Sequence, residues 1–329
     1  MKLTKMVTAL LIAMIMVVLA GCGSSGSQTA PKKAQTDFPK KEITIVVPWN
    51  AGGGNDVMAR KVATIFKEMG ITAVVKNVPG GNGVVGINEV VTAKPDGYTV
   101  GVQTSSTLSA MALGKTSIKA DKMTNISLMC DEPHILVVRG DAPWKNLKEM
   151  IDYMKVNPNK VTIATPGSNN VNHAVAAMLG KVADVEFQHV PFDGGALVIP
   201  QLLGGHVDAA VLKPSEVVAQ IKEGKFKGFG VNDDKRLANL PEVPTFKEGG
   251  FDLFKAGPVK QMSFIVAPAG LDPAVRDKLV EIFNKATQSE GYQKLGKDSG
   301  FNAPLRTPSD LDNDVKAFLS SEAFTKIFK

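Results

Sequence analysis

Several short segments of the sequence have the composition of anion-binding loops. Three of them lie between a β-rich run and a helical pattern and are rich in glycine or amides: residues 50–54, 165–170 and 192–195. The fourth, residues 104–107, ends a β-rich run and is rich in hydroxyls. Helix N-termini present unpaired N–H groups and a partial positive charge, and glycine allows a ligand to approach the backbone closely. One glycine after a strand is more often a simple turn, but several such junctions in one chain favour a shared carboxylate or phosphate site.

The catalytic alternatives have less support. The four histidines are dispersed, none lies in an H-E-x-x-H pair and the chain has no G-x-S-x-G elbow. Ser168 and His173 are close in sequence, so an exported serine hydrolase or esterase is the alternative function. That chemistry needs an orienting group and an oxyanion site, and the sequence shows no convincing triad. We therefore expect a binding protein with no catalytic residues.

Residues 81–86 match the dinucleotide-binding pattern G-x-G-x-x-G. A dinucleotide site also requires an acidic residue at the end of the next strand, where this chain has only hydroxyl residues. We interpret these glycines as turn and packing residues and expect no cofactor. Cys130 is the only cysteine beyond Cys22, which excludes a disulfide framework and a cysteine-based metal site. No metal is expected.

The N-terminus indicates export. Lys2 and Lys5 precede an apolar run that is shorter than the roughly 20 residues of a membrane-spanning helix. Leu-Ala-Gly-Cys22 follows and resembles the bacterial lipobox, so residues 1–21 are predicted to be a lipoprotein signal peptide. Cys22 would be lipidated and would anchor the protein to the cell membrane, on its extracytoplasmic side. Residues 22–41 then form a flexible tether of mainly polar and small residues.

Length and charge narrow the possibilities further. Residues 42–329 are long enough for two domains. The net charge of the full chain is +6, but the basic residues are scattered, so we expect no nucleic-acid partner. Short β-rich runs alternate with amphipathic stretches, which predicts an α/β fold. Four helix N-caps are predicted at the starts of these stretches: Asn146, Asn170, Asp272 and Thr307.

A series of collinear motifs goes beyond a generic α/β pattern. Their sequences are I-V-V-P with G-G-G-N-D-x3-R (45–60), N-V-P-G-G-N-G (77–83), A-K-P-D-G-Y-T (93–99), H-V-P-F-D-G-G (189–195), L-G-G-H-V-D (203–208) and L-P-E-V-P-T (240–245). In this order they resemble the Bug family, the substrate-binding proteins of tripartite tricarboxylate transporters. The resemblance extends from about residue 42 to the C-terminus.

The resemblance implies a fold and a set of partners. The fold is a two-domain clamshell of the periplasmic-binding-protein type, type II-like, with two crossovers. Domain 1 would comprise residues 42–143 and 257–329, and domain 2 residues 144–256. The partners would be a small carboxylate ligand and the large and small membrane subunits of the transporter. The protein is expected to be a monomer.

The family's ligand-binding loops can be carried over to this chain residue by residue. The implied ligand-binding residues are Trp49, Asn50, Ala51, Gly52, Gly53, Thr104, Ser105, Ser106, Gly167, Ser168, Asn169, Asn170, Phe192, Asp193, Gly194, Gly195 and Asp208. These loops contain no lysine or arginine, which favours recognition by backbone dipoles over a salt bridge. Trp49 and Asn50 depart from the usual family residues, so the identity of the substrate cannot be transferred.

Overall fold

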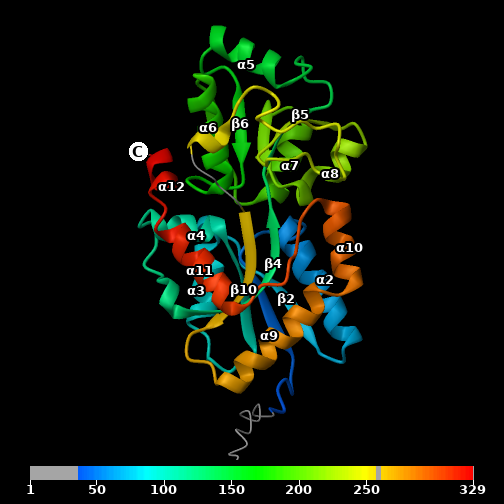
Figure 1. Cartoon of the computed structure of the whole chain (residues 1–329), viewed down its shortest axis with the longest axis vertical. Helices are drawn as coiled ribbons and strands as arrows, with labels where there is room; N and C mark the ends of the chain where they lie inside the picture. Colours follow the sequence, from blue (N-terminus) through cyan, green and yellow to red (C-terminus); the bar gives the residue numbers. More distant parts are fainter. Residues whose placement is uncertain (1–35, 257–260, 329) are drawn as a thin grey trace, which may run out of the picture. The chain divides into compact units, whose positions relative to one another are not determined.

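The computed structural model describes residues 36–256 and 261–328, so the predicted signal peptide, Cys22 and most of the tether lie outside the described residues. The α/β class is confirmed: helices surround two five-stranded sheets (Figure 1). The first sheet has the strand order β2-β1-β3-β10-β4 and the second the order β7-β6-β8-β5-β9. In the described ranges, no helix is long and apolar enough to cross a membrane.

The first sheet is parallel at one side and antiparallel at the other. β1 pairs in parallel with β2 and β3, whereas β10 pairs antiparallel with β3 and β4. Its strands are β1 (Ile43–Val47), β2 (Ala73–Asn77), β3 (Thr99–Thr104), β4 (Met123–Glu132) and β10 (Gln261–Pro268). The helices of this part are α2 (Gly54–Glu68), α3 (Val84–Val91), α4 (Ser105–Ala112), α9 (Pro273–Thr287), α10 (Glu290–Ser299) and α11 (Pro308–Leu319).

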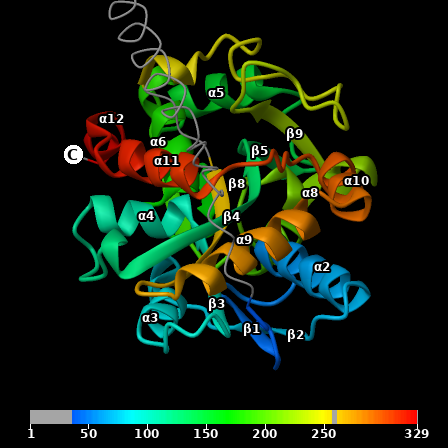
Figure 2. The ribbon, with the colours of Figure 1, turned by 60° about the horizontal axis from the view of Figure 1, so that its bottom comes forward.

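Helices cover both faces of the first sheet. The helices α2 and α9 lie side by side (Figure 2), and one apolar cluster joins them to β1. In this cluster the ring centroids of Phe66 and Phe283 are 4.8 Å apart. A second cluster joins the opposite face to α3, α4 and α11. Burial on both faces explains why four of the five residues of β1 are apolar, with only Thr44 polar. The same arrangement leaves the carboxyl ends of β1 and β3 free to carry polar loops.

The second sheet has a similar plan. β6 pairs in parallel with β7 and β8, and β5 pairs antiparallel with β8 and β9. The strands are β5 (Ile135–Arg139), β6 (Thr162–Thr165), β7 (Gln188–Pro191), β8 (Ala209–Leu212) and β9 (Phe226–Val231). The helices are α5 (Leu147–Val156), α6 (Val171–Ala183), α7 (Gly195–Leu203) and α8 (Pro214–Lys222).

The chain passes between the sheets earlier than the domain boundary at residue 143 implies. β4 ends at Glu132 in the first sheet and β5 begins at Ile135 in the second. The C-terminal helix α12 (Glu322–Ile327) also departs from the predicted division, because Phe324 and Ile327 pack in the apolar cluster of the second sheet. Hydrogen-bond partners decide the sheet to which a strand belongs, and these partners are not visible in local periodicity.

Gly86 in α3 provides a test of close packing. A Cβ at this position would lie 2.7 Å from Pro48 Cβ, 2.8 Å from Pro48 Cα and 2.8 Å from the Val78 carbonyl oxygen. Backbone on two sides cannot yield easily, so Gly86→Ala is expected to lower the free energy of unfolding by about 1–3 kcal/mol, measured by urea denaturation.

The matched control for this change is Gly291→Ala, also within a helix. There the added Cβ would approach only the end of the flexible Lys61 side chain, at 3.2 Å. Alanine is a better helix former than glycine by roughly 1 kcal/mol, so this variant should be neutral or slightly more stable. Equal losses in the two variants would contradict the close packing of α3 on Pro48.

Candidate functional site

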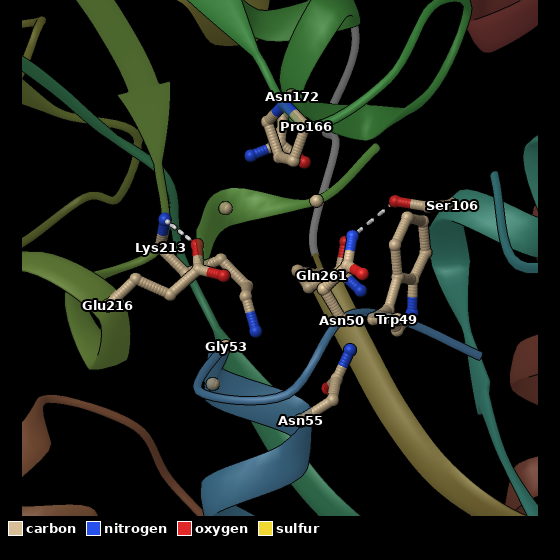
Figure 3. A pocket seen from close by; sticks show the side chains of 13 residues that line it. Trp49, Asn50, Gly53, Asn55, Ser106, Pro166, Asn172, Lys213, Glu216 and Gln261 are labelled. Atoms are coloured by element: carbon tan, nitrogen blue, oxygen red, sulfur yellow. Dashed lines mark hydrogen bonds between the residues drawn. The ribbon is translucent and has the colours of Figure 1, made fainter. Parts of the chain in front are cut away.

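A cavity with an empty volume of about 390 Å³, part of it open to solvent, is lined by loops from both sheets (Figure 3). Most of its lining residues lie in the loops after β1, β3, β6, β7 and β8 or in the first turns of the helices that follow these loops, and one lies at the start of β10. The lining residues are Trp49, Asn50, Gly53, Gly54, Asn55, Ser106, Pro166, Asn172, Gly194, Gly195, Lys213, Glu216 and Gln261.

Lys213 is the cation of this cavity. It is the N-cap residue of α8, is 5% exposed, and extends its side chain toward Gly53 (Figure 3). Its Nζ lies 3.2 Å from Glu132 Oε1, and Glu132 is 1% exposed. Burial by itself would lower the pKa of Lys213, but the carboxylates of Glu132 and Glu216 outweigh this effect and raise it. Lys213 is therefore a stable ammonium at neutral pH.

Glu216 brings a carboxyl group to the same place. It accepts a hydrogen bond from the Lys213 backbone N–H and another from the Gly54 N–H, at the start of α2. A methyl group on Gly54 would lie 2.8 Å from Lys213 Nζ and 3.3 Å from Glu216 Cγ, so both side chains rest on one glycine. Burial raises the pKa of Glu216 above its ordinary value, although the Lys213 charge and these two hydrogen bonds oppose the shift.

Several donors in the cavity are unused in the part of the chain that the structure describes. Lys213 Nζ and Trp49 Nε1 are buried atoms without a hydrogen-bond partner of good geometry there. Asn55 Oδ1 accepts from Ser263 Oγ at 2.8 Å, which leaves the Asn55 amide hydrogens as additional donors. Buried donors are normally satisfied. The arrangement therefore suits a ligand that supplies hydrogen-bond acceptors, as a carboxylate does.

The loops of the two sheets also bind each other directly. Asn50 Nδ2 donates to the Asp193 carbonyl oxygen at 2.6 Å. Asn82 Nδ2 donates to the Ser168 carbonyl oxygen at 2.6 Å, and Asn82 Oδ1 accepts from Asn170 Nδ2 at 3.4 Å. These bonds hold together the loops that frame the cavity.

Some predicted site residues line the cavity and others support it. Trp49, Asn50, Gly53, Ser106, Gly194 and Gly195 line it. The predicted segment 167–170 instead contacts Asn82, and a Cβ on Gly167, whose φ is +131°, would lie 1.9 Å from Asn82 Oδ1. Asn170 caps α6 through the His173 N–H. The sequence correctly placed this cap but not its partner in the other sheet.

The remaining predicted residues serve local structure. Thr104 caps α4 by accepting from the Thr107 N–H, and Ser105 Oγ accepts from the Met262 N–H in β10. The Gly52 N–H donates to the Asp56 carboxylate, and the neighbouring residue Ala51 is exposed. Phe192 packs on the apolar core of the second sheet.

Asp208 is placed away from the cavity. Its carboxylate accepts from the Thr162 N–H and hydroxyl, at 2.8 and 2.7 Å. Thr162 begins β6, whereas the cavity loops follow the ends of the parallel strands. Asp208 precedes β8 and so lies at the opposite edge of the sheet, which corrects its assignment to the ligand site.

Five lining residues lie outside the predicted loops: Asn55, Asn172, Lys213, Glu216 and Gln261. Gly54 and Pro166 lie within the predicted loops 50–54 and 165–170 but were not among the implied binding residues. A signal existed for Lys213 and Glu216, because the β-rich run at 207–212 predicts a strand directly before Lys213, and Pro214 is typical of the first turn of a helix. That junction is equivalent to the glycine-rich ones, and Lys213 and Glu216 occupy its first turn. The expectation that the site relies on backbone dipoles alone thus omitted the charged pair.

His173 has a structural environment. Its Nδ1 accepts from the Asn169 N–H at 3.0 Å, and its ring stacks on His189 at 3.6 Å. Burial, with a smaller contribution from His189, lowers the pKa of His173 to about 4. With Nδ1 already accepting a backbone proton and with a weakened basicity, this ring is poorly suited to activate Ser168.

The contact made by Asn82 yields a prediction for binding. Asn82 has a left-handed backbone, with φ of 56°, so Asn82→Gly removes the amide without straining the chain. Loss of its hydrogen bonds to Ser168 and Asn170 should favour separation of the loops and weaken ligand affinity about 5–10-fold. Titration calorimetry with a ligand from the panel described below measures this change.

The control is Asn159→Gly. Asn159 also has φ of 56°, and its side-chain amide donates to Glu186 within the second part of the fold. Its affinity should match that of the wild type. Weakening of the same size in both variants would show that the Asn82 contact does not govern binding.

Comparison with known proteins agrees with this geometry. Residues 58–315 match the family model described as the tripartite tricarboxylate transporter family receptor. The chain belongs to this family. A curated relative from Cupriavidus necator, the UPF0065 protein in the gbd 5′ region, is 32% identical over 282 residues, with 84% of each chain covered.

Solved structures extend the family match to the fold. The periplasmic binding protein BugD is 30% identical, with a TM-score of 0.82 over 88% of this chain and 99% of its own. MatC from Rhodopseudomonas palustris, solved with bound malate, is 28% identical, with a TM-score of 0.81 over 89% of this chain and 100% of its own. The family receptor therefore has the predicted two-domain clamshell fold of periplasmic binding proteins.

Proposed function

We propose that this chain is an extracytoplasmic solute-binding lipoprotein that captures a small carboxylate between its two domains. The observation that carries the proposal is the buried Lys213 ammonium in a cavity lined from both sheets. The start of α2 adds backbone N–H groups and the positive end of a helix dipole at the same cavity. The malate bound to MatC supports a carboxylate ligand for this member of the family.

The proposed binding residues combine the predicted loops with the residues that line the cavity. Trp49, Asn55 and Lys213 would donate to the ligand, and Gly53, Gly54 and Gly194 would allow close approach of backbone. The predicted residues at 167–170 would act in closure through Asn82. Ligand contacts with both domains would shift the population toward the closed form.

The receptor is proposed to act without chemistry of its own. It would be held at the membrane by a lipid on Cys22, work as a monomer and deliver its ligand to the large and small membrane subunits of a tripartite tricarboxylate transporter. Deleting the gene for the large subunit should abolish uptake of the ligand. Normal uptake in that strain would refute the partnership.

The first test is thermal unfolding of the full chain in detergent, with a panel of mono-, di- and tricarboxylates, amino acids and neutral sugars. A ligand that binds only the folded state should raise the midpoint, equivalent to about 2.7 kcal/mol at 100 times its dissociation constant. Recovery of the ligand unchanged would support a binding protein. No shift with any acid, or consumption of a panel compound, would contradict the proposal and favour the Ser168–His173 hydrolase.

A further inference from the structure

The cavity contains opposite charges side by side, and this restricts the ligand more than the family does. Lys213 and Glu216 both rest on Gly54, at the start of α2, and both line the cavity (Figure 3). Glu132 lies behind Lys213 at 3.2 Å. A site for anions alone would need the ammonium and the helix terminus but not a carboxyl group directed at the same space.

The charges of Glu132, Glu216 and Lys213 do not sum to zero. With every group ionised, Glu132 and Glu216 provide two negative charges and Lys213 provides one positive charge. Buried charge is costly unless it is paired. Each additional carboxylate of a di- or tricarboxylate would increase the negative excess in a desolvated site. A zwitterion, with one positive and one negative group, would instead leave this excess unchanged.

The hydrogen-bonding capacity agrees with the charges. Lys213 has three N–H donors, of which Glu132 can occupy one, and Trp49 Nε1 is unused in the described part of the chain. Glu216 accepts two backbone N–H groups, but a carboxylate has about four acceptor positions. Donors for a carboxylate and acceptors for an ammonium therefore converge on one small volume.

From this juxtaposition, we infer that the ligand is a zwitterionic α-amino acid, with its carboxylate on Lys213 and its ammonium group on Glu216. This inference rests on the proposed binding function and specifies its substrate class. Glu216 acts as the specificity-determining residue, because a hydroxy acid brings a negative charge without the ammonium group that would pair with Glu216, and so increases the negative excess. Lys213 supplies the carboxylate affinity that amino acids and hydroxy acids share.

The test compares matched pairs by titration calorimetry of the full chain in detergent. The probes are alanine with lactate, leucine with 2-hydroxyisocaproate, phenylalanine with phenyllactate and aspartate with malate. In at least one pair, the amino acid should bind 10-fold or more tightly than its 2-hydroxy partner. The wild-type comparison needs no variant, so it does not depend on whether a substituted protein folds.

Two variants assign the roles. Glu216→Gln keeps the shape of the side chain and should reduce the preference for the amino acid to below 3-fold, because it removes the carboxylate charge that pairs with the ligand's ammonium group. Lys213→Met should weaken both members of the pair at least 10-fold. Circular dichroism establishes that each variant is folded before the titration.

The outcomes separate the inference from the function on which it rests. Tight binding of a hydroxy acid or dicarboxylate without an amino-acid preference would overturn the zwitterion and leave the carboxylate receptor intact. An unchanged preference in folded Glu216→Gln would also overturn it. If no amino acid and no carboxylate binds, both the zwitterionic ligand and the proposed carboxylate-binding function are rejected.

Discussion

Glu132→Gln is expected to destabilise the folded protein by about 3 kcal/mol. Glu132 and Lys213 are almost fully buried and their charged atoms are 3.2 Å apart. Removing one partner of such a pair leaves a buried charge uncompensated, which typically costs 3–5 kcal/mol. The low end applies because Glu216 also raises the pKa of Lys213 and stays in place. Glu132 Oε2 also accepts from the Ser215 N–H, a bond that glutamine can retain through its carbonyl oxygen.

Urea denaturation at pH 7 measures this loss. The control is Glu223→Gln, which removes one partner of the exposed ion pair with Lys225. Exposed pairs contribute roughly 0–1 kcal/mol, so the control should be nearly unchanged. If Glu132→Gln were as stable as the control, the buried pair would not hold the start of α8 against β4.

Acid is expected to destabilise the protein through buried neutral histidines. His134 is fully buried where the chain passes from β4 to β5. Burial, reinforced by the nearby Lys213 charge, lowers the pKa of His134 from 6.5 to about 3. The unfolded chain therefore binds a proton near pH 6.5 that the folded chain takes up only near pH 3. Stability should fall as the pH decreases through this window, by about 5 kcal/mol over its full width at 1.36 kcal/mol per pKa unit.

His173 adds to the same loss of stability, because its pKa is lowered from 6.5 to about 4 and the unfolded chain therefore binds its proton at a higher pH than the folded chain. Glu216 acts in the opposite direction: its pKa is raised above the ordinary value, so the folded state binds a proton more tightly than the unfolded state and this group favours folding as the pH falls. The large pKa shifts of His134 and His173 have a greater effect on stability than the opposing shift of Glu216. The net expectation is a loss of stability between pH 6.5 and 4.

Urea denaturation at pH 7 and pH 4 tests the role of His134. His134→Gln should reduce the difference between the two pH values by several kcal/mol, whatever its effect at pH 7. His206→Gln, at an exposed position, should leave the difference unchanged. An identical acid loss in wild type and His134→Gln would mean that other groups cause it.

Local sequence patterns determined much of this fold. Apolar runs bounded by turns predict strands at 42–47, 73–78 and 99–104, and the observed strands at 43–47, 73–77 and 99–104 agree within one residue, because such runs are local signals. The N-caps at Asn146, Asn170, Asp272 and Thr307 are all confirmed, since capping depends on a side chain and N–H groups within the next three residues. Four elements were not anticipated: α4, the ten-residue β4, α10 and α12.

In the site, too, local patterns in the sequence were predictable and contacts between distant residues were not. The sequence alone identified the family and four polar strand-to-helix junctions, several of whose residues line the cavity, because composition and order along the chain carry that information. It could not show that Glu132, at the passage between sheets, pairs with Lys213, or that Asn82 bonds to the loop after β6. These partners are 81 and 86 residues apart, and only the packing of the two sheets brings them together. The charged character of the cavity is therefore a property of the tertiary structure, since it arises where the carboxyl ends of strands from both sheets meet.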